Sequence, residues 1–432
     1  MSAKHAKALL GSRRFAPLFG AQVLSGFTDA TFRNSIIALI AFAGLSFAGM
    51  EKQVLIPLAG SIFTFPFILL SAFGGQLADK YDKAVVLKRV KFAEIIIMLI
   101  AAAGLYFNSA PLLLLTLFFM GAQSALFTPS RTAAMPQWLE DEELITGNAL
   151  ISGVLNLLLL IGTAFGLMMT TKAGGTVWVS SALIIVATMG WLSTRQVPKA
   201  PPPAPNLKLR KNLIASTFNT LGEAARHPDV FRPMLGTAWF WGMSALVMVL
   251  VPSYIPQILH YDVNVMFFVM LLFTVGMFVG AMITALLTKG GDAHGFSVIG
   301  AFGLVVFGLD LYFTGGDNGR ATIGGVSEFF ADKGNGRLMF DLFATSVCGG
   351  LFVVPLQAMS QRRAEPKLRA RLLSAGAILN AIATTGMQLS LFFMNKAGLP
   401  MRTSFLVIAV VSLIVALYSL KRWLAKRKLA IA

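Results

Sequence analysis

The chain has 432 residues, of which 56% are apolar and only 13% are charged, and its mean hydropathy is +0.73. A soluble globular protein is roughly a quarter charged, so this composition excludes a soluble enzyme, a disordered chain and a secreted disulfide scaffold. The net charge of +17 comes from 36 Lys and Arg against 19 Asp and Glu. In a membrane protein such an excess indicates cytoplasmic loops and anionic lipid, so no nucleic-acid partner is expected.

Apolar stretches with few charges occur twelve times along the chain. A helix needs roughly 20 apolar residues to cross a bilayer, and the first stretch is too long for a cleavable signal peptide. The pattern predicts an all-α polytopic membrane protein with 12 transmembrane helices. The expected crossings lie near residues 17–45, 54–77, 90–107, 111–127, 150–170, 177–192, 233–250, 265–287, 296–313, 338–360, 372–394 and 405–420.

A polar linker separates the crossings into two groups of six. We expect an N-terminal six-helix bundle over residues 1–194, a cytoplasmic linker over 195–230 and a C-terminal six-helix bundle over 231–432. The proline run at 201–205 stiffens the first part of the linker.

The second part of the linker has apolar residues at the spacing of one helix face. These residues are Ile214, Phe218, Leu221 and Ala225. Because basic residues precede them, we expect an amphipathic helix lying on the inner membrane surface. The alternative is a solvated connector with one or two helical turns.

The basic residues are distributed unevenly between the loops. If both termini lie on one side of the membrane, 27 of the 36 Lys and Arg residues fall on that side and 7 on the other. Cytoplasmic loops carry the excess of Lys and Arg in membrane proteins. The distribution therefore predicts an even number of crossings and cytoplasmic termini.

The loop after the second crossing has the sequence GQLADKYDK, from Gly75 to Lys83. It resembles the cytoplasmic signature of the major facilitator superfamily, with Asp82 where that family has glycine. The resemblance implies a major facilitator fold in which Gly75, Asp79, Lys80 and Lys83 belong to a gate latch. Gly75 is expected to allow close helix packing near the membrane edge.

Polar residues are concentrated in the first crossing. Gln22, Ser25, Asp29 and Arg33 follow one another at spacings of three, four and four, which places them on one helix face. A charge inside the bilayer costs roughly 2.5–3.5 kcal/mol on insertion scales, so this face is expected to point inward. Either Asp29 and Arg33 neutralise each other as an i,i+4 pair, or Asp29 faces a cavity and meets a cationic group or a proton.

Three further acidic residues lie near the ends of expected crossings. Glu94 follows Lys91 near the start of the third crossing, so we expect it close to the interface and structurally paired. Asp310 and Asp341 flank the long loop between the ninth and tenth crossings and are expected at the membrane interface.

Several segments resemble a narrower branch, the bacterial lysophospholipid transporters, which occur alone or fused ahead of an acyltransferase. On the first crossing the segment 22–34 carries the likeness. After the fourth crossing the segments 127–131 and 147–148 carry it. In the second half of the chain it continues in 236–242 (GTAWFWG) and 352–358 (FVVPLQA).

The resemblance implies a headgroup cavity with both signs of charge. Asp29 matches the branch's helix-1 aspartate and would meet an amine. Arg131 takes the place of a lysine and, with Arg33, would meet a phosphate. The expected substrate-binding residues are Gln22, Asp29, Arg33, Asn34, Arg131, Asn148 and Asn380.

The function implied is lysophospholipid transport across the bacterial inner membrane by alternating access around one central cavity, in support of phospholipid re-acylation. The expected partners are this amphiphile, membrane lipid and a candidate acyltransferase. The alternatives are a proton-coupled exporter of drugs or small metabolites, with Asp29 as the proton site, and a non-transporting anchor for an acyltransferase. No nucleotide-binding loop, metal-ligand spacing or nucleophile motif occurs, so we expect no enzyme activity, metal or cofactor.

Overall fold

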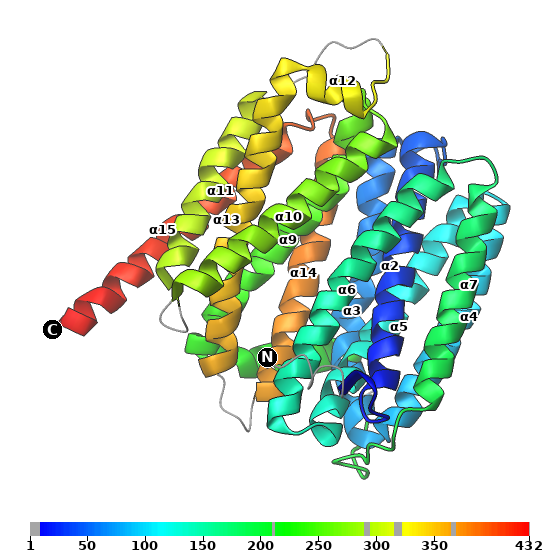
Figure 1. Ribbon diagram of the computed structural model, residues 1–432. Coiled ribbons are helices and arrows are strands. Elements are labelled where there is room, and N and C mark those ends of the chain that lie inside the picture. The colour runs from blue at the N-terminus through cyan, green and yellow to red at the C-terminus, as the bar shows by residue number, and fades with distance from the viewer. Residues whose placement is uncertain (1–8, 210–211, 289–293, 315–321, 364–368, 432) are drawn as a thin grey trace. The chain divides into compact units, whose positions relative to one another are not determined.

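The computed structural model describes residues 9–209, 212–288, 294–314, 322–363 and 369–431, apart from some side chains within the helices. Across these residues the chain forms fourteen helices, α2 to α15, and no strand (Figure 1). Twelve of these helices have at least 21 residues, and they follow the order of the predicted crossings. The predicted all-α fold is therefore confirmed.

The chain forms two compact units. Unit 1 consists of Met1–Met50 and Ala59–Leu221, and unit 2 consists of Glu51–Leu58 and Gly222–Ala432. The bundle and linker boundaries expected from the sequence stay a prediction. The long helices in the first part of the chain are α2 (Ala16–Phe42), α3 (Lys52–Lys80), α4 (Lys83–Tyr106), α5 (Ala110–Trp138), α6 (Asp141–Thr170) and α7 (Gly175–Arg195).

Within unit 1, α2 lies between α6 and α7, and α4 packs against α5 and α7 (Figure 1). The contact between α2 and α6 depends on two glycines spaced four apart. A Cβ on Gly162 would lie 2.7 Å from the carbonyl oxygen of Phe27, and one on Gly166 would lie 2.4 Å from that of Thr31. Small residues at this spacing let two helix backbones approach closely, so these glycines fix the position of α2.

Unit 2 repeats this device between α10 and α13, where a Cβ on Gly280 would lie 2.0 Å from the carbonyl oxygen of Val347. Helix α13 also packs against α9 and α11, while α9 contacts α14 and α11 contacts α15. The helices from the linker onward are α8 (Leu213–Ala225), α9 (Pro228–Gln257), α10 (Val263–Thr288), α11 (His294–Thr314), α12 (Val326–Ala331), α13 (Lys333–Arg363), α14 (Arg369–Lys396) and α15 (Thr403–Ile431).

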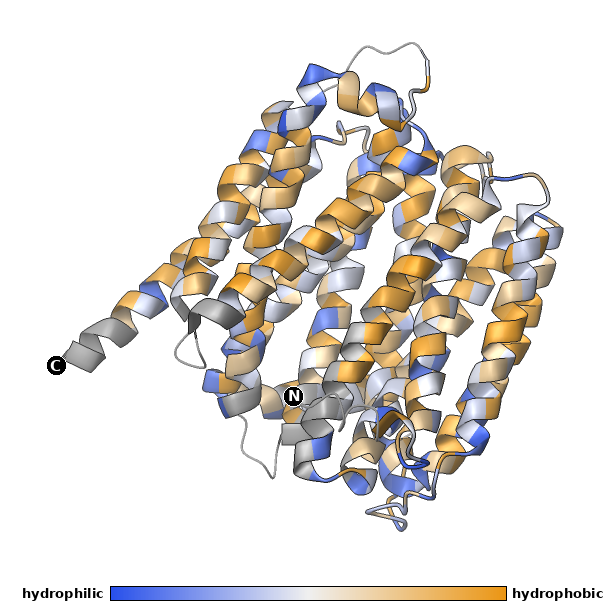
Figure 2. Cartoon of the chain, viewed as in Figure 1, coloured by the Kyte–Doolittle hydropathy of each residue, from blue (hydrophilic) through white to orange (hydrophobic). Residues whose placement is uncertain are grey.

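Nine helices of the described residues are long and apolar enough to cross a membrane, by length and composition alone. The other three long helices are α2, α4 and α6. Charged residues interrupt α2 at Asp29 and Arg33 and α4 at Lys91 and Glu94, and in α6 the apolar part runs over Leu157–Thr170. Figure 2 shows apolar residues along much of the outer long helices and hydrophilic residues near many helix ends.

Two helices of unit 1 extend well beyond their apolar parts. Helix α4 begins at Lys83 rather than near residue 90, and α5 continues to Trp138 rather than ending near residue 127. Arg131, which the hydropathy pattern assigned to a loop, therefore lies on a helix, and Lys91, which the pattern placed at the very start of a crossing, lies more than two turns inside α4. Hydropathy detects the apolar part of a helix and misses the polar turns that continue it.

The linker contains helix α8, which matches the expected amphipathic segment. Thr217 on its polar side donates a hydrogen bond from Oγ1 to the carbonyl oxygen of Ile68 on α3, at 3.0 Å. The apolar side chains of Ile214 and Phe218 are 59% and 68% exposed. The polar side of α8 thus faces α3 and its apolar side is open, while its place on a membrane surface stays a prediction.

Helix α12 lies in the long loop between α11 and α13 and was not predicted from the sequence. The ring of Phe329 is fully buried and lies 5.0 Å from that of Tyr261. Asn335 donates hydrogen bonds from Nδ2 to the Tyr261 hydroxyl at 2.7 Å and to the Phe329 carbonyl oxygen at 2.9 Å. These contacts give the loop a small core of its own.

Candidate functional site

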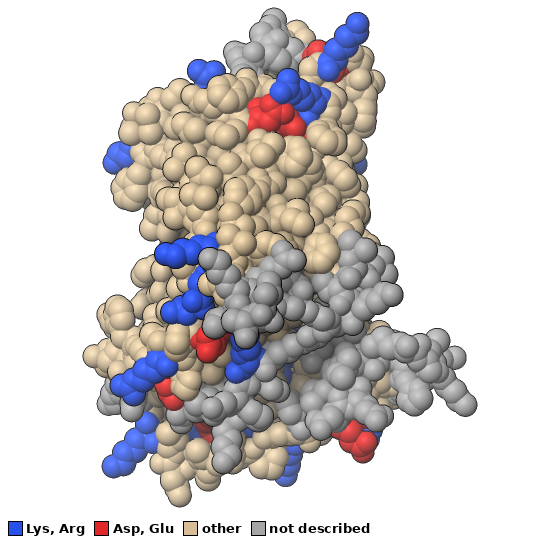
Figure 3. Space-filling model, turned by 90° about the vertical axis from the view of Figure 1, so that its left-hand side faces the viewer, with Lys and Arg blue, Asp and Glu red and all other residues tan. Residues whose placement is uncertain are grey.

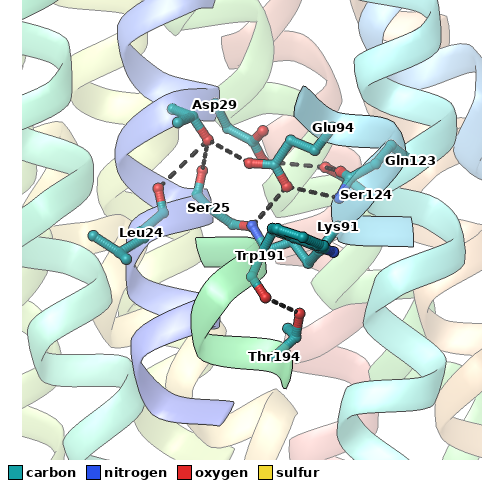
Figure 4. A network of polar contacts seen from close by, with 10 residues as sticks. Leu24, Ser25, Asp29, Lys91, Glu94, Gln123, Ser124, Trp191 and Thr194 are labelled. Carbon is teal, nitrogen blue, oxygen red and sulfur yellow. Dashed lines mark hydrogen bonds and ion pairs between the residues drawn. The ribbon is translucent and has the colours of Figure 1, made fainter. Parts of the chain in front are cut away.

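A buried ion pair lies in the middle of α4 (Figure 4). Lys91 Nζ and Glu94 Oε2 are 2.6 Å apart, and the two side chains are 0% and 2% exposed. The ammonium also lies 5.5 Å from the centre of the Phe127 ring. Gly190 on α7 leaves room for it, because a Cβ there would lie 3.1 Å from Lys91 Nζ.

Neighbouring helices satisfy the hydrogen bonds of this pair. From α2, Thr28 Oγ1 donates to Glu94 Oε1 at 3.0 Å, and the Ser25 hydroxyl oxygen accepts from Lys91 Nζ at 2.5 Å. From α5, Gln123 Nε2 donates to Glu94 Oε2 at 2.9 Å. A buried ion pair is stable only with good geometry and such additional hydrogen bonds. The pair therefore ties α2, α4 and α5 together.

Asp29 is joined to this cluster by one hydroxyl. Ser124 Oγ lies 3.1 Å from Asp29 Oδ2 and 3.2 Å from Gln123 Oε1, so its one proton donates to either oxygen. Asp29 is half-buried on α2. With Lys91 positive and with Glu94 and Asp29 both ionised, the three groups carry one net negative charge. The cluster is thus suited to a cation or a proton at Asp29.

The expected pair between Asp29 and Arg33 does not form as an ion pair in the part of the chain that the structure describes. Arg33 is exposed, and its guanidinium lies 5.8 Å from the centre of the Phe63 ring on α3. The i,i+4 spacing makes the contact possible, but Asp29 accepts its hydrogen bond from Ser124 on α5 instead. Both interpretations of Asp29 stay predictions, because Arg33 makes no ion pair with Asp29 but still interacts with it electrostatically.

Three other expected site residues have buried polar atoms without a hydrogen-bond partner. In unit 1 these atoms are Gln22 Oε1 on α2 and Arg131 Nε on α5, and in unit 2 the atom is Asn380 Oδ1 on α14. On α9, Trp239 Nε1 is also buried without a hydrogen-bond partner, and the Trp239 ring centre lies 5.2 Å from that of Phe352 on α13. Buried polar atoms are nearly always paired, so these four are candidates for ligand contacts.

Two expected site residues do not join the cluster. Asn34 is 3% exposed and donates from Nδ2 to the Ala30 carbonyl oxygen at 2.8 Å and to Thr163 Oγ1 on α6 at 3.2 Å. These contacts give Asn34 a role in packing α2 against α6. Asn148 lies on α6, and its side chain is outside the part of the chain that the structure describes.

The close helix packing expected at Gly75 occurs at Gly74 instead. A Cβ on Gly74 would lie 3.0 Å from the carbonyl oxygen of Ala125 and 3.2 Å from Cγ of Pro129, both on α5. A Cβ on Gly75 would meet nothing within 4 Å. Successive residues of a helix point about 100° apart, so only one of two adjacent glycines can face a given neighbour.

The end of the gate motif holds the linker in place. Asp82 has φ −55° and ψ 121°, which does not require glycine, and its Oδ1 accepts from the backbone N–H groups of Ala84 at 2.8 Å and Ala200 at 3.1 Å. Lys83 is buried and donates from Nζ to the Pro201 carbonyl oxygen at 3.4 Å. Asp82 thus caps α4 and fixes the start of the linker.

The two remaining motif residues lie at the end of α3. Asp79 is exposed, and its carbonyl oxygen accepts from the backbone N–H of Ala204 at 3.0 Å. Lys80 Nζ lies 5.7 Å from the centre of the Tyr81 ring. The gate role of these residues stays a prediction.

Sequence reasoning missed Lys91, Gln123 and Ser124 as members of the polar cluster. Lys91 was placed at the very start of the third crossing, and the other two lie inside an apolar stretch of α5. The available signal was the adjacent pair Gln123-Ser124 in that stretch. Only the packing of α5 against α4 and α2 shows that Gln123 reaches Glu94 and that Ser124 reaches Asp29.

Comparison with known proteins agrees with this architecture. The sequence model of the Major Facilitator Superfamily matches residues 18–332. A protein of Enterobacter sp. (strain 638) described as a lysophospholipid transporter LplT is 25% identical over 407 residues, which cover 92% of both chains. The protein of the same name from Cronobacter sakazakii is 25% identical over 433 residues and 97% of both chains.

Solved structures show the same fold at low sequence identity. The crystal structure of a D-xylose-proton symporter matches with a TM-score of 0.70 at 11% identity, over 94% of this chain and 96% of that chain. A POT family transporter in complex with 5-aminolevulinic acid matches with a TM-score of 0.69 at 14% identity, over 94% and 95%. These likenesses concern the fold alone.

Proposed function

We propose that the chain, which belongs to the major facilitator superfamily, transports a lysophospholipid. It is a multi-pass membrane transporter and not an enzyme, as the family and the transporter relatives show. The proposed substrate is supported by relatives described as lysophospholipid transporters, which are similar to this chain over nearly its full length.

The observation that carries the proposal is the position of Asp29. It is half-buried beside an ion pair whose own charges already balance, so its negative charge is available to a ligand. A protonated amine of a phospholipid headgroup fits a carboxylate of this kind through a charge-assisted hydrogen bond.

The phosphate of the same headgroup needs a cation. We assign it to Arg33, which is exposed and is in no ion pair among the described residues, and to Arg131, whose Nε is buried without a hydrogen-bond partner. Gln22, also in unit 1, supplies a further unpaired polar atom. Arg is well suited to phosphate because its N–H groups match the oxygen geometry.

The proposal also includes transport by alternating access in the bacterial inner membrane, cytoplasmic termini and re-acylation of the product by a partner acyltransferase. The placement of the termini is supported by the 27 of 36 basic residues that fall on one side. Cys348 is the single cysteine and is buried. A Ser2→Cys variant treated with a thiol reagent in intact cells therefore reports on which side of the membrane the N-terminus lies. Labelling by a membrane-impermeant reagent would contradict a cytoplasmic N-terminus.

One observation favours a second candidate, proton-coupled transport of a small solute. The chain of contacts from Asp29 through Ser124 and Gln123 to Glu94 connects two carboxylates by groups that exchange hydrogen bonds. A carboxylate inside the membrane is a candidate proton site by default.

Proteoliposomes distinguish the two candidates. Labelled lysophosphatidylethanolamine is followed across the bilayer with and without a pH gradient, beside protein-free liposomes as the control. Lipid movement that requires the protein and ignores the gradient supports the first proposal. Absence of lipid movement, together with gradient-driven uptake of a small solute, contradicts it and supports the second.

A further inference from the structure

A groove of about 500 Å³ lies in unit 2 at the ends of α11 and α13. Asp310 and Phe313 contribute to it from the last turns of α11, and Arg337, Phe340 and Asp341 contribute from the first turns of α13. None of these residues belongs to the polar cluster of unit 1. The groove combines charged groups with large apolar side chains.

The charges of the groove do not balance. Arg337 Nε donates to Asp310 Oδ2 at 3.1 Å, and a second guanidinium nitrogen pairs with the other oxygen of Asp310. Asp341 is only 1% exposed, and its Oδ2 is buried without a hydrogen-bond partner. Two carboxylates thus share one guanidinium, and one oxygen of the buried carboxylate, Asp341 Oδ2, has no hydrogen-bond partner. A buried carboxylate oxygen without a donor is costly, so Asp341 Oδ2 is suited to a ligand that brings a cationic N–H.

Apolar side chains beside these charges are exposed. Val306 and Phe340 are 60% and 61% exposed, and Phe313 is 76% exposed. The surface in Figure 3 shows basic and acidic residues side by side near the upper end, above a broad area with no charge. Such a border between charge and apolar surface is typical of the level of lipid headgroups at a membrane.

We propose that this groove binds a membrane lipid whose headgroup carries a primary ammonium and a phosphate. The ammonium donates to Asp341. The phosphate accepts from the N–H groups of Arg337 that Asp310 leaves unused, since a guanidinium has five. The acyl chain lies along Phe313 and Phe340. A choline headgroup has no N–H to donate, and a glycerol headgroup has no positive charge, so the groove selects against both.

Binding of single lipids to the purified full chain in detergent tests this site. Phosphatidylethanolamine, phosphatidylcholine and phosphatidylglycerol are titrated separately, and bound lipid is counted by native mass spectrometry. We expect phosphatidylethanolamine to bind with a Kd about tenfold lower than either of the others, equivalent to ~1.4 kcal/mol. Equal affinity for the three lipids would overturn the proposal.

Variants locate the binding. Asp341→Asn should raise the Kd for phosphatidylethanolamine to that for phosphatidylcholine, and an unchanged selectivity would overturn the role of Asp341. Phe313→Ala should weaken all three lipids equally. The matched control is Phe393→Ala on α14, which removes a ring that is 61% exposed and should change nothing. Identical effects of the two Phe variants would contradict the groove as the site.

This proposal and the transport proposal fail separately. Binding is measured without transport, and Asp341→Asn should lose the lipid selectivity while its rate of lysophosphatidylethanolamine transport in proteoliposomes stays unchanged. Loss of lipid selectivity in an Asp29→Asn variant would show that the bound lipid occupies the polar cluster of unit 1 rather than the groove, and would overturn the groove.

Discussion

The polar cluster of unit 1 and the charged groove of unit 2 both contain a buried carboxylate, but only one of the two is satisfied. Glu94 accepts hydrogen bonds from Lys91, Thr28 and Gln123, whereas Asp341 Oδ2 accepts none. Burial alone therefore does not distinguish a structural charge from a binding one. The number of satisfied hydrogen bonds distinguishes the two kinds of charge, because an unpaired buried group retains its affinity for a donor.

The largest effect is expected from breaking the satisfied pair. Glu94→Gln removes the carboxylate 2.6 Å from the buried Lys91 ammonium and leaves only Asp29 as a counter-charge, which is not in contact with it. This change should lower the free energy of unfolding by about 3–5 kcal/mol. Thermal unfolding in detergent measures the loss. The double variant Lys91→Met with Glu94→Gln should recover much of the stability, and Lys172→Met, at an exposed lysine, serves as the control. A stable single variant would contradict the structural role of the pair.

A smaller loss is expected from crowding the same ammonium. Gly190→Ala places a methyl group 3.1 Å from Lys91 Nζ, which its hydrogen bonds hold in place. Overpacking of this kind costs about 1–3 kcal/mol. Gly386→Ala on α14 is the matched control, because a Cβ there meets nothing within 4 Å. If Gly190→Ala were as stable as the control, Lys91 would not be fixed as described.

The smallest expected effect is a gain in stability rather than a loss. Asp341→Asn replaces an unsatisfied buried carboxylate by a neutral group of the same shape, so in lipid-free detergent the unfolding temperature should rise slightly. The gain is on the order of 1 kcal/mol. A loss comparable to that of Glu94→Gln would mean that Asp341 has a partner within the fold.

The order and number of the long helices could be predicted from the sequence, because each contains an apolar stretch. The ends of these helices could not be predicted: α4 already begins at Lys83 and α5 continues through Arg131, in segments whose charge hides the helix from a hydropathy analysis. Helix α12 is too short to give such a signal, and it depends on the contacts of Phe329 with Tyr261.

The candidate site was predicted only in part. Asp29 was singled out correctly as an unusual charge within a helix, but its hydrogen-bond partner is Ser124 rather than Arg33. Spacing along one helix shows which contacts are possible, whereas Ser124 reaches Asp29 only through tertiary packing. For the same reason the glycine of close packing near the gate motif is Gly74 and not Gly75.

The central claim is that Asp29 receives the ammonium of the transported headgroup. It is tested by the rates at which the wild type and Asp29→Asn move lysophosphatidylethanolamine and lysophosphatidylglycerol in proteoliposomes, with Asp229→Asn at an exposed position of α9 as the control. We predict that Asp29→Asn slows the ethanolamine lipid by about tenfold or more, equivalent to ~1.4 kcal/mol, and leaves the glycerol lipid nearly unchanged. Equal slowing of both lipids, or of neither, would contradict the claim.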